Sequence, residues 1–251
     1  MEALDAYAID VPGMQVRVLG NCTSTNDLLL VEGRANVLLA AEEQSAGRGR
    51  RGRRWHSRPG KGVTFSMSKL LRRPLRELGA LSLAAGVGVA RALRALGATQ
   101  VALKWPNDLL VGKAKLGGIL VQTRGRAEGV FAVVGIGINC REDAALAERL
   151  RRPVAALEHY ACVERNQLIG ALARSVNETL ARYEEGGLEP LRAEWESLHA
   201  HAGARLRVRL ADGRVITGVA LGLESDGALR LRTAAGVRTL SGAHVVSARP
   251  A

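Results

Sequence analysis

Five arginines and three glycines alternate in one stretch, Gly47-Arg48-Gly49-Arg50-Arg51-Gly52-Arg53-Arg54, which Trp55 closes. Glycine destabilises regular structure and adjacent guanidinium groups repel one another, so the stretch predicts a mobile, solvated loop. Glycine also lets backbone N–H groups approach a ligand closely, and arginine presents forked donors that match phosphate and carboxylate oxygens. We therefore expect an anion-binding loop that becomes ordered when its ligand arrives.

The basic loop alone fits a nucleic acid, a nucleoside triphosphate or an acidic membrane surface. The chain has 36 Lys and Arg against 24 Asp and Glu, and a net charge of +12 is typical of nucleic-acid-binding proteins. The charge is uneven, because residues 1–46 contain two basic and seven acidic side chains, whereas residues 47–61 contain seven basic and no acidic ones. A positive field focused on one loop favours a compact ligand over a long polyanion.

Further polar residues follow strands or open helices. Ser24 or Thr25 is expected to cap a helix that continues into an apolar run, and spare hydroxyls at a helix start can bind a polar ligand group. Pro106 ends a strand, so Asn107 and Asp108 serve either as turn residues or as partners for a ligand or a magnesium ion.

Glycines accompany two later strands. Lys115 opens a strand in which Gly117 and Gly118 leave the backbone bare, a pattern that often marks the close approach of a ligand or another backbone. The run Gly135-Ile136-Gly137-Ile138-Asn139 lacks the third glycine and the acidic residue of a dinucleotide-binding fingerprint.

The elements that must position these residues follow from periodicity. Alternating or short apolar runs predict strands at 15–19, 37–41, 62–68, 101–104, from Lys115 onward and at 130–134, and helical spacing predicts helices over 75–96 and within 142–198. Near residues 199–203 the pattern changes to about five short strands with turns at Asp212-Gly213 and Asp226-Gly227. We therefore expect an α+β catalytic domain over 1–200 and a small SH3-like β-barrel over 201–251, with a solvated arginine face on its first strand.

Composition narrows the setting of the protein. The apolar runs are too short to span a bilayer, and no basic segment followed by an apolar stretch opens the chain as a secretory signal would. Cys22, Cys140 and Cys162 are scattered and form no CxxC pair, so metal and disulfide roles are not favoured. A cytoplasmic protein is the expectation.

In combination, the motifs closely resemble those of the biotin protein ligases, in order and in spacing. The match covers nearly the whole chain, including the C-terminal barrel, and departs mildly at Thr23, where an acidic residue is common, and at Gly117, where alanine is common. The motifs are Ser24-Thr25-Asn26, Gln44 with the arginine/glycine stretch and Trp55, Lys104-Trp105-Pro106-Asn107-Asp108, Lys115-Leu116-Gly117-Gly118-Ile119 and Gly135-Ile136-Gly137-Ile138-Asn139.

The resemblance implies a mixed β-sheet flanked by helices, as in class II synthetases and biotin ligases, in the short form without a DNA-binding domain. It implies that biotin and ATP with Mg²⁺ give biotinyl-5′-AMP, from which biotin passes to a lysine of the biotin carboxyl carrier protein of acetyl-CoA carboxylase. Neither DNA nor a membrane is an expected partner, and a homodimer is compatible with the family.

By motif match, Lys115 and Arg50 are the expected catalytic residues. The expected biotin-binding residues are Ser24, Thr25, Asn26, Gln44, Arg48, Gly49, Arg50, Trp55, Lys115, Gly117 and Gly118. The expected ATP- or adenylate-binding residues are Arg50, Arg53, Asn107, Asp108, Lys115 and Asn139, with Asp108 also the candidate metal ligand. Two alternatives stay open, a lipoate ligase of the same superfamily and a nucleic-acid-binding module that uses the basic loop.

Overall fold

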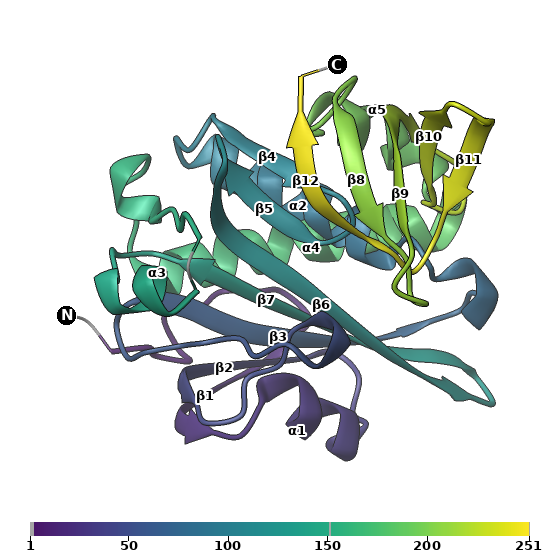
Figure 1. The fold of residues 1–251 in the computed structure, drawn as a ribbon. Coiled ribbons are helices and arrows are strands. Elements are labelled where there is room, and N and C mark those ends of the chain that lie inside the picture. The colour runs from purple at the N-terminus through teal and green to yellow at the C-terminus, as the bar shows by residue number, and fades with distance from the viewer. Residues whose placement is uncertain (1–2, 151, 251) are drawn as a thin grey trace.

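A seven-stranded mixed sheet forms the body of the computed structural model, which describes residues 3–150 and 152–250 (Figure 1). Its strand order is β1-β2-β3-β7-β6-β5-β4, in which β1 and β2 pair in parallel and the other neighbours pair antiparallel. The strands are β1 (Gln15–Cys22), β2 (Val37–Gln44), β3 (Gly62–Leu71), β4 (Val101–Lys104), β5 (Asp108–Val111), β6 (Ala114–Arg126) and β7 (Gly129–Asn139).

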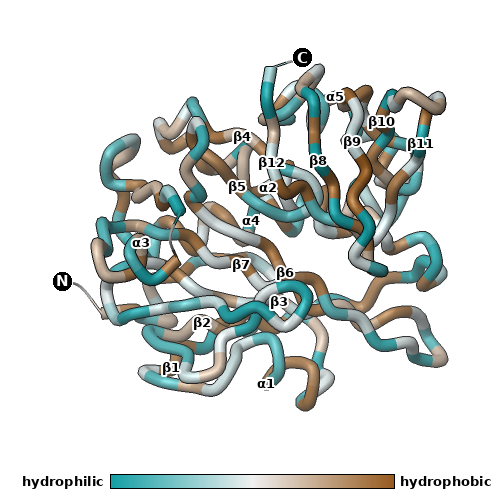
Figure 2. Tube along the Cα trace, viewed as in Figure 1, coloured by the Kyte–Doolittle hydropathy of each residue, from teal (hydrophilic) through white to brown (hydrophobic). Residues whose placement is uncertain are grey.

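Helices cover both faces of this sheet, as its strand sequences require. In β2, Leu38 and Ala40 join the main core with α2 (Leu81–Ala95) and α4 (Arg165–Gly186), whereas Val37 and Leu39 join a second cluster with Leu29 of α1 (Thr25–Glu32). Successive side chains of a strand point to opposite faces, so a strand covered on both faces is apolar throughout. Figure 2 shows hydrophobic residues concentrated along the central strands and the packed helices, and hydrophilic residues at the turns. The expected mixed sheet flanked by helices is confirmed.

The C-terminal segment forms a separate five-stranded antiparallel sheet, with strand order β11-β10-β9-β8-β12. No pairing between β11 and β12 closes it within the described residues, so the barrel stays a prediction. Its strands are β8 (Arg205–Arg209), β9 (Val215–Leu223), β10 (Leu229–Thr233), β11 (Gly236–Leu240) and β12 (His244–Arg249).

The two sheets are held against each other by direct contacts. The Trp105 indole N–H donates to the carbonyl of Gly227 at 3.0 Å, and the Leu223 N–H donates to the carboxylate of Glu196 on α5 (Glu189–Ser197) at 3.0 Å. Leu206 on β8 is fully buried in the same core cluster as the seven-stranded sheet. These contacts fix the C-terminal sheet beside the edge of the larger one.

Two predicted helical segments had wrong boundaries, and one strand was not predicted. The helix expected over 75–96 begins only at Leu81, because residues 75–77 form a separate 3-10 turn (Leu75–Glu77) and Gly79 follows it. The segment 142–198 is not continuously helical, because α3 (Ala144–Leu150) precedes a stretch that contains Pro153 and the short turn Leu157–His159 before α4 begins. Strand β5 was not predicted, since its four residues directly follow a turn.

None of the helices in the described part of the chain is both long and apolar enough to cross a bilayer. The cysteines Cys22, Cys140 and Cys162 are all free thiols.

Candidate active site

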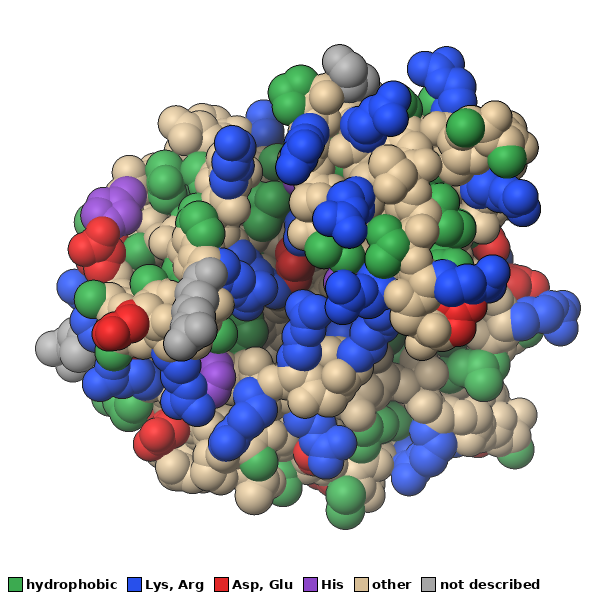
Figure 3. All heavy atoms as spheres, viewed as in Figure 1, with side chains coloured by type: hydrophobic (Ala, Val, Ile, Leu, Met, Phe, Trp, Pro, Cys, Tyr) green, Lys and Arg blue, Asp and Glu red, His purple; other side chains and the backbone are tan. Residues whose placement is uncertain are grey.

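A cavity of about 540 Å³ lies between the large sheet, the arginine loop and the C-terminal sheet. Its walls include the ends of β2, β6 and β7, the turn at Trp105–Asn107, and residues 243–245 at the start of β12. Figure 3 shows Lys and Arg side chains gathered around a hollow at this place. Segments that are far apart in sequence therefore meet at one site.

Most of the predicted site residues lie together in the lining of this cavity. Gly117 is an exception, because a Cβ there would lie 2.5 Å from the carbonyl oxygen of Gly137, so this glycine serves the close packing of β6 on β7. Asn139 lines an adjoining pocket of about 180 Å³ instead, where its amide donates to the Lys115 carbonyl at 3.2 Å. The predicted residues that line the main cavity are Ser24, Thr25, Asn26, Gln44, Arg48, Gly49, Arg50, Arg53, Trp55, Asn107, Asp108, Lys115 and Gly118.

One end of the cavity is uncharged and hydrogen-bonded. Ser24 is the N-cap of α1, as predicted, and its Oγ accepts from the Asp27 N–H at 3.4 Å. The next residue, Thr25, donates its backbone N–H to Gln44 Oε1 at 2.8 Å, which orients the Gln44 amide at the end of β2. Ser24, Thr25 and Gln44 are each less than a tenth exposed, so their polar atoms must bond within the protein or to a ligand.

Two glycines of β7 make room for this end and for the indole that borders it. A Cβ at Gly135 would lie 2.1 Å from Asn26 Oδ1, and one at Gly137 would lie 2.3 Å from Trp55 ring carbons. The Trp55 indole N–H donates to Thr64 Oγ1 on β3 at 3.2 Å. The glycines of the Gly-x-Gly run are therefore needed to seat Asn26 and Trp55.

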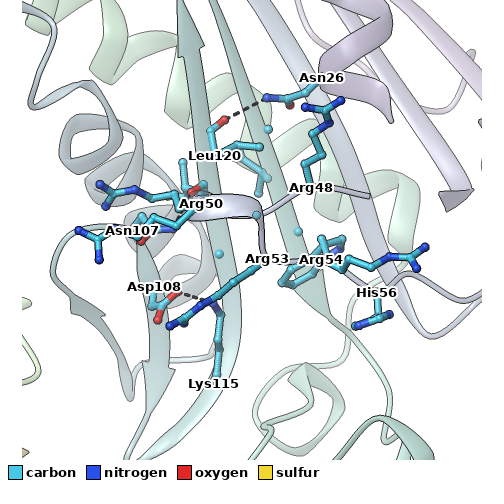
Figure 4. A pocket seen from close by; sticks show the side chains of 18 of the residues that line it. Asn26, Arg48, Arg50, Arg53, Arg54, His56, Asn107, Asp108, Lys115 and Leu120 are labelled. Atoms are coloured by element: carbon cyan, nitrogen blue, oxygen red, sulfur yellow. Dashed lines mark hydrogen bonds and ion pairs between the residues drawn. The ribbon is translucent and has the colours of Figure 1, made fainter. Parts of the chain in front are cut away.

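The other end of the cavity is cationic. Lys115 forms an ion pair with Asp108, and both side chains are less than a fifth exposed (Figure 4). Burial lowers the pKa of Lys115, an effect that the neighbouring Asp108 carboxylate opposes. Burial likewise lowers the pKa of Lys104 and of Arg50. Buried cations of this kind have lost part of their stabilisation by water. An incoming anion restores it, because opposite charges attract strongly where water is excluded.

The arginines of the loop are divided between two tasks. Arg48 pairs with Asp27 on α1 at 2.7 Å, Arg54 donates to the Ser45 carbonyl at 2.6 Å, and Arg51 donates to His244 Nδ1 at 2.6 Å. The side chains of Arg50 and Arg53 form no ion pair with any residue in 3–150 or 152–250, and Arg53 extends toward the Asp108–Lys115 pair (Figure 4). Three arginines thus tie the loop to its surroundings, while two remain for a ligand.

Some lining residues were missed by sequence reasoning. Thr64 lines the cavity from β3, and Ser66, two residues further along the strand, is buried outside the lining; alternating hydroxyls in an otherwise apolar strand were a usable signal. Lys104 stands within a motif that was quoted but received no role. Arg152 and His244 carried no local signal, because only the tertiary fold brings them to the cavity.

The donor set does not form a resident metal site. In the described part of the chain, no three His, Cys, Asp or Glu side chains cluster as metal ligands would. Asp108 is the one carboxylate in the lining of the main cavity. Magnesium commonly binds through one or two carboxylates together with substrate phosphates and water, so Asp108 suits a metal that arrives with a nucleotide.

The cavity of this helix-flanked mixed sheet joins an uncharged hydrogen-bonding end to a cluster of cations, an arrangement that suits an anionic, nucleotide-like substrate. The chain belongs to the biotin/lipoate A/B protein ligase family, whose pattern matches residues 19–139, and residues 202–246 match the biotin protein ligase C-terminal domain.

Named relatives agree with this assignment. The chain is 36% identical over 225 residues to the bifunctional ligase/repressor BirA of Escherichia coli (strain K12), across 87% of this chain and 70% of that protein. It is 30% identical to the biotin–[acetyl-CoA-carboxylase] ligase of Mycobacterium tuberculosis, across 94% of this chain and 90% of that one. The solved structure of the biotin protein ligase from Aquifex aeolicus in complex with biotin and ATP superposes with a TM-score of 0.78 and 26% identity, across 94% of this chain and 99% of that one.

Proposed function

We propose that this protein is an ATP-dependent biotin protein ligase, which forms biotinyl-5′-AMP and then transfers biotin to a lysine of a biotin carboxyl carrier protein. The observation that carries the proposal is the continuity of the cavity, from the Ser24–Thr25–Gln44 end to the Lys115–Asp108 end. The first end suits an uncharged polar ring, and the second suits a carboxylate together with a phosphate. The relatives named as biotin–[acetyl-CoA-carboxylase] ligases support the same substrate and carrier.

The uncharged end favours biotin over lipoate. Gln44 Oε1 is occupied by Thr25, and the Gln44 amide nitrogen forms no hydrogen bond with the described residues, so its N–H groups can donate to a ligand. The ureido ring of biotin offers a carbonyl acceptor beside N–H donors, whereas the dithiolane ring of lipoate offers neither. A site that leaves a buried donor unpaired discriminates strongly against such a ligand.

The cationic end supports the first half-reaction. A biotin carboxylate oxygen attacks the α-phosphorus of ATP, a new bond from that oxygen to the phosphorus forms, the bond from the α-phosphorus to the α,β-bridging oxygen breaks, and pyrophosphate leaves with that electron pair. Lys115 and Arg50 hold the two reacting anions together and stabilise the charge that grows on the phosphate oxygens. Asp108 is the carboxylate that would hold a Mg²⁺ ion bound together with ATP, and the metal would supply positive charge to the phosphates.

The remaining assigned residues bind and enclose the substrates. Arg53 contacts the phosphates and Asn107 faces the nucleotide, whereas Asn139, in the adjoining pocket, holds the backbone of Lys115 through its amide. Trp55, held by Thr64, closes over biotin and excludes water from the mixed anhydride. Asn26, Arg48, Gly49 and Gly118 complete the biotin side.

In the second half-reaction the neutral ε-amine of the carrier lysine attacks the biotinyl carbonyl. An amide bond forms, AMP leaves, and the amine releases its proton. We infer that residues 1–200 form the domain that performs both steps and that residues 201–251 form an SH3-like barrel, which the match of residues 202–246 to the ligase C-terminal domain supports.

The direct test is the transfer of labelled biotin to a purified carrier domain with and without ATP and Mg²⁺. We expect labelling of one carrier lysine only when ATP and Mg²⁺ are present. A thermal-shift titration should show a higher melting temperature with biotin but not with lipoate. Binding to nucleic acid with a steep salt dependence, without ATP-dependent labelling, would instead favour the nucleic-acid module.

A further inference from the structure

Ser66 on β3 is fully buried beneath the uncharged end of the cavity and is not part of its lining. Its hydroxyl oxygen lies 2.7 Å from Thr25 Oγ1 and 2.6 Å from Asn26 Oδ1. Both distances are those of O–H···O hydrogen bonds, so each contact contains a proton. Ser66 on β3 thus links the side chains of Thr25 and Asn26, which are consecutive residues of α1.

The orientation of the Asn26 amide is fixed by a group that can only accept. Asn26 Nδ2 donates to the Leu120 carbonyl at 3.3 Å and to Gln122 Oε1 at 2.8 Å (Figure 4 shows the first bond). A backbone carbonyl has no proton to give, so the Asn26 nitrogen must face Leu120. Asn26 Oδ1 therefore faces Ser66 and accepts its hydrogen bond.

The proton count then determines the direction of every bond in the chain. Ser66 has one hydroxyl proton, which goes to Asn26, so the Thr25 hydroxyl must donate to Ser66. With its only proton used in this way, the Thr25 hydroxyl can only accept from anything else. Gln44 Oε1 lies 3.1 Å from the Thr25 hydroxyl, within hydrogen-bonding range but farther than the 2.7 Å to Ser66, so the hydroxyl proton goes to Ser66 and Gln44 Oε1 accepts from the Thr25 backbone N–H at 2.8 Å.

We propose that Ser66 is a positioning residue for biotin binding, which holds the Thr25 hydroxyl as an obligate acceptor for an N–H of the ureido ring. The inference rests on the proposed function and adds a residue that does not touch the ligand. The same bonds show that the polar atoms of Asn26 are all engaged by Ser66, Leu120 and Gln122, so Asn26 acts with Ser66 rather than as a ligand-binding amide.

The substitution Ser66→Ala removes both hydrogen bonds. Asn26 Oδ1 loses its donor, and the Thr25 hydroxyl becomes free to turn its proton toward Gln44 or toward the ligand. A ligand N–H then meets a hydroxyl that is no longer fixed as an acceptor. We expect the KM for biotin in pyrophosphate release to rise about tenfold, the change for one lost hydrogen bond, with the KM for ATP unchanged.

Ser68 supplies a matched control, because it lies two residues away on the same strand, is equally buried and is also hydrogen-bonded. Its hydroxyl donates to the Arg34 carbonyl at 2.7 Å and accepts from the Val37 N–H at 3.1 Å, and neither partner is in the cavity lining. Ser68→Ala should lower the melting temperature and leave the KM for biotin unchanged. An equal rise in both alanine variants would overturn the proposal.

A double-mutant cycle separates positioning from general damage. If Ser66 acts through Thr25, Ser66→Ala should raise the KM for biotin in the wild-type background but have no further effect in a Thr25→Val background. Effects that multiply would refute the inference. Gln122→Ala, at a half-buried site, provides a second variant should Ser66→Ala fail to fold. We expect it to raise the KM for biotin about threefold and to have no further effect in the Thr25→Val background.

The two proposals fail in different ways. A wild-type chain that releases no pyrophosphate from ATP in the presence of biotin refutes the proposed function. A fully active wild-type chain with additive Ser66 and Thr25 effects refutes only the role of Ser66.

Discussion

Replacement of Lys115 by alanine should impair adenylate formation far more than folding. The ammonium group pairs with Asp108 in a part of the cavity where both side chains are less than a fifth exposed, at 16% and 19%. A charged donor directed at growing negative charge in such an enclosed site contributes about 3 kcal/mol to the transition state. We therefore expect the rate of biotin-dependent pyrophosphate release to fall between about 10²- and 10³-fold.

The cost to stability should be much smaller. Removal of one partner from a fully buried ion pair costs about 3–5 kcal/mol, but here water still reaches both side chains, so about 1–2 kcal/mol is expected. Alanine at this position leaves the Asp108 carboxylate with Lys104 and Arg50 as nearby cations, which limits the loss. The melting temperature should fall by only a few degrees.

The assay should separate the two half-reactions. Pyrophosphate release measures adenylation, whereas biotin transfer from supplied biotinyl-5′-AMP bypasses it, and we expect the first to lose more. Lys113→Ala is the control, because this exposed lysine lies two residues away on the preceding turn. Near-normal pyrophosphate release from Lys115→Ala, or a loss explained by an unfolded chain, would contradict the catalytic assignment.

Three further predictions test the arginine loop, the packing of Trp55 and the buried His199. Arg50→Gly should release more biotinyl-5′-AMP and label nearby lysines, measured by chromatography of the free adenylate; no increase would argue against shielding by the loop. Gly137→Ala should raise the KM for biotin about tenfold, because its Cβ would lie 2.3 Å from the Trp55 ring and force the indole off Thr64, and unchanged indole fluorescence would contradict this. Burial lowers the pKa of His199 to about 4, below the ordinary value of about 6.5. Between these two pH values the unfolded chain binds a proton that the folded chain does not. The free energy of unfolding is therefore highest above pH 6.5 and falls by up to about 3 kcal/mol as the pH drops from 6.5 toward 4. His199→Phe keeps the stacking on Trp195 and should flatten that part of the pH–stability curve in urea titrations; an unchanged slope would exclude His199 as its source.

Local sequence predicted the elements where a strong periodic or capping signal exists. Ser24 caps α1 because a hydroxyl precedes an apolar helical run, and the C-terminal strands alternate plainly. The start of α2 was misplaced because Leu75 and Leu78 fit helical spacing, although they belong to a turn that packs separately. Such an end depends on tertiary packing, which periodicity does not contain.

The site was predicted where its residues form a motif and missed where they do not. Arg50, Gln44 and Lys115 were identifiable because each stands in a distinctive local run. His244 lies almost two hundred residues beyond the loop that it contacts, at the first position of β12, and no local pattern marks it. Gly117 was expected to contact biotin, because a glycine within a strand allows close approach either by a ligand or by a neighbouring strand. The sheet register shows that the neighbouring strand β7 lies against it.

The arginine loop explains how one segment can be both stable and attracted to an anion. Five adjacent cations would repel one another, yet Arg48, Arg51 and Arg54 are bound to three separate parts of the fold, namely α1, β12 with the turn before it, and the residues after β2. Burial and the surrounding arginines lower the pKa of His244, which favours the neutral ring that can accept from Arg51.

Arg50 and Arg53 form no ion pair with the described residues and face the cavity together with Lys104 and Lys115, and Arg51 still repels Arg50. A ligand that carries a carboxylate and a phosphate relieves that remaining repulsion, so its binding and the ordering of the loop should be coupled. Arg48, Arg51 and Arg54 therefore stabilise the position of the loop, whereas Arg50 and Arg53 select the anionic ligand that it binds.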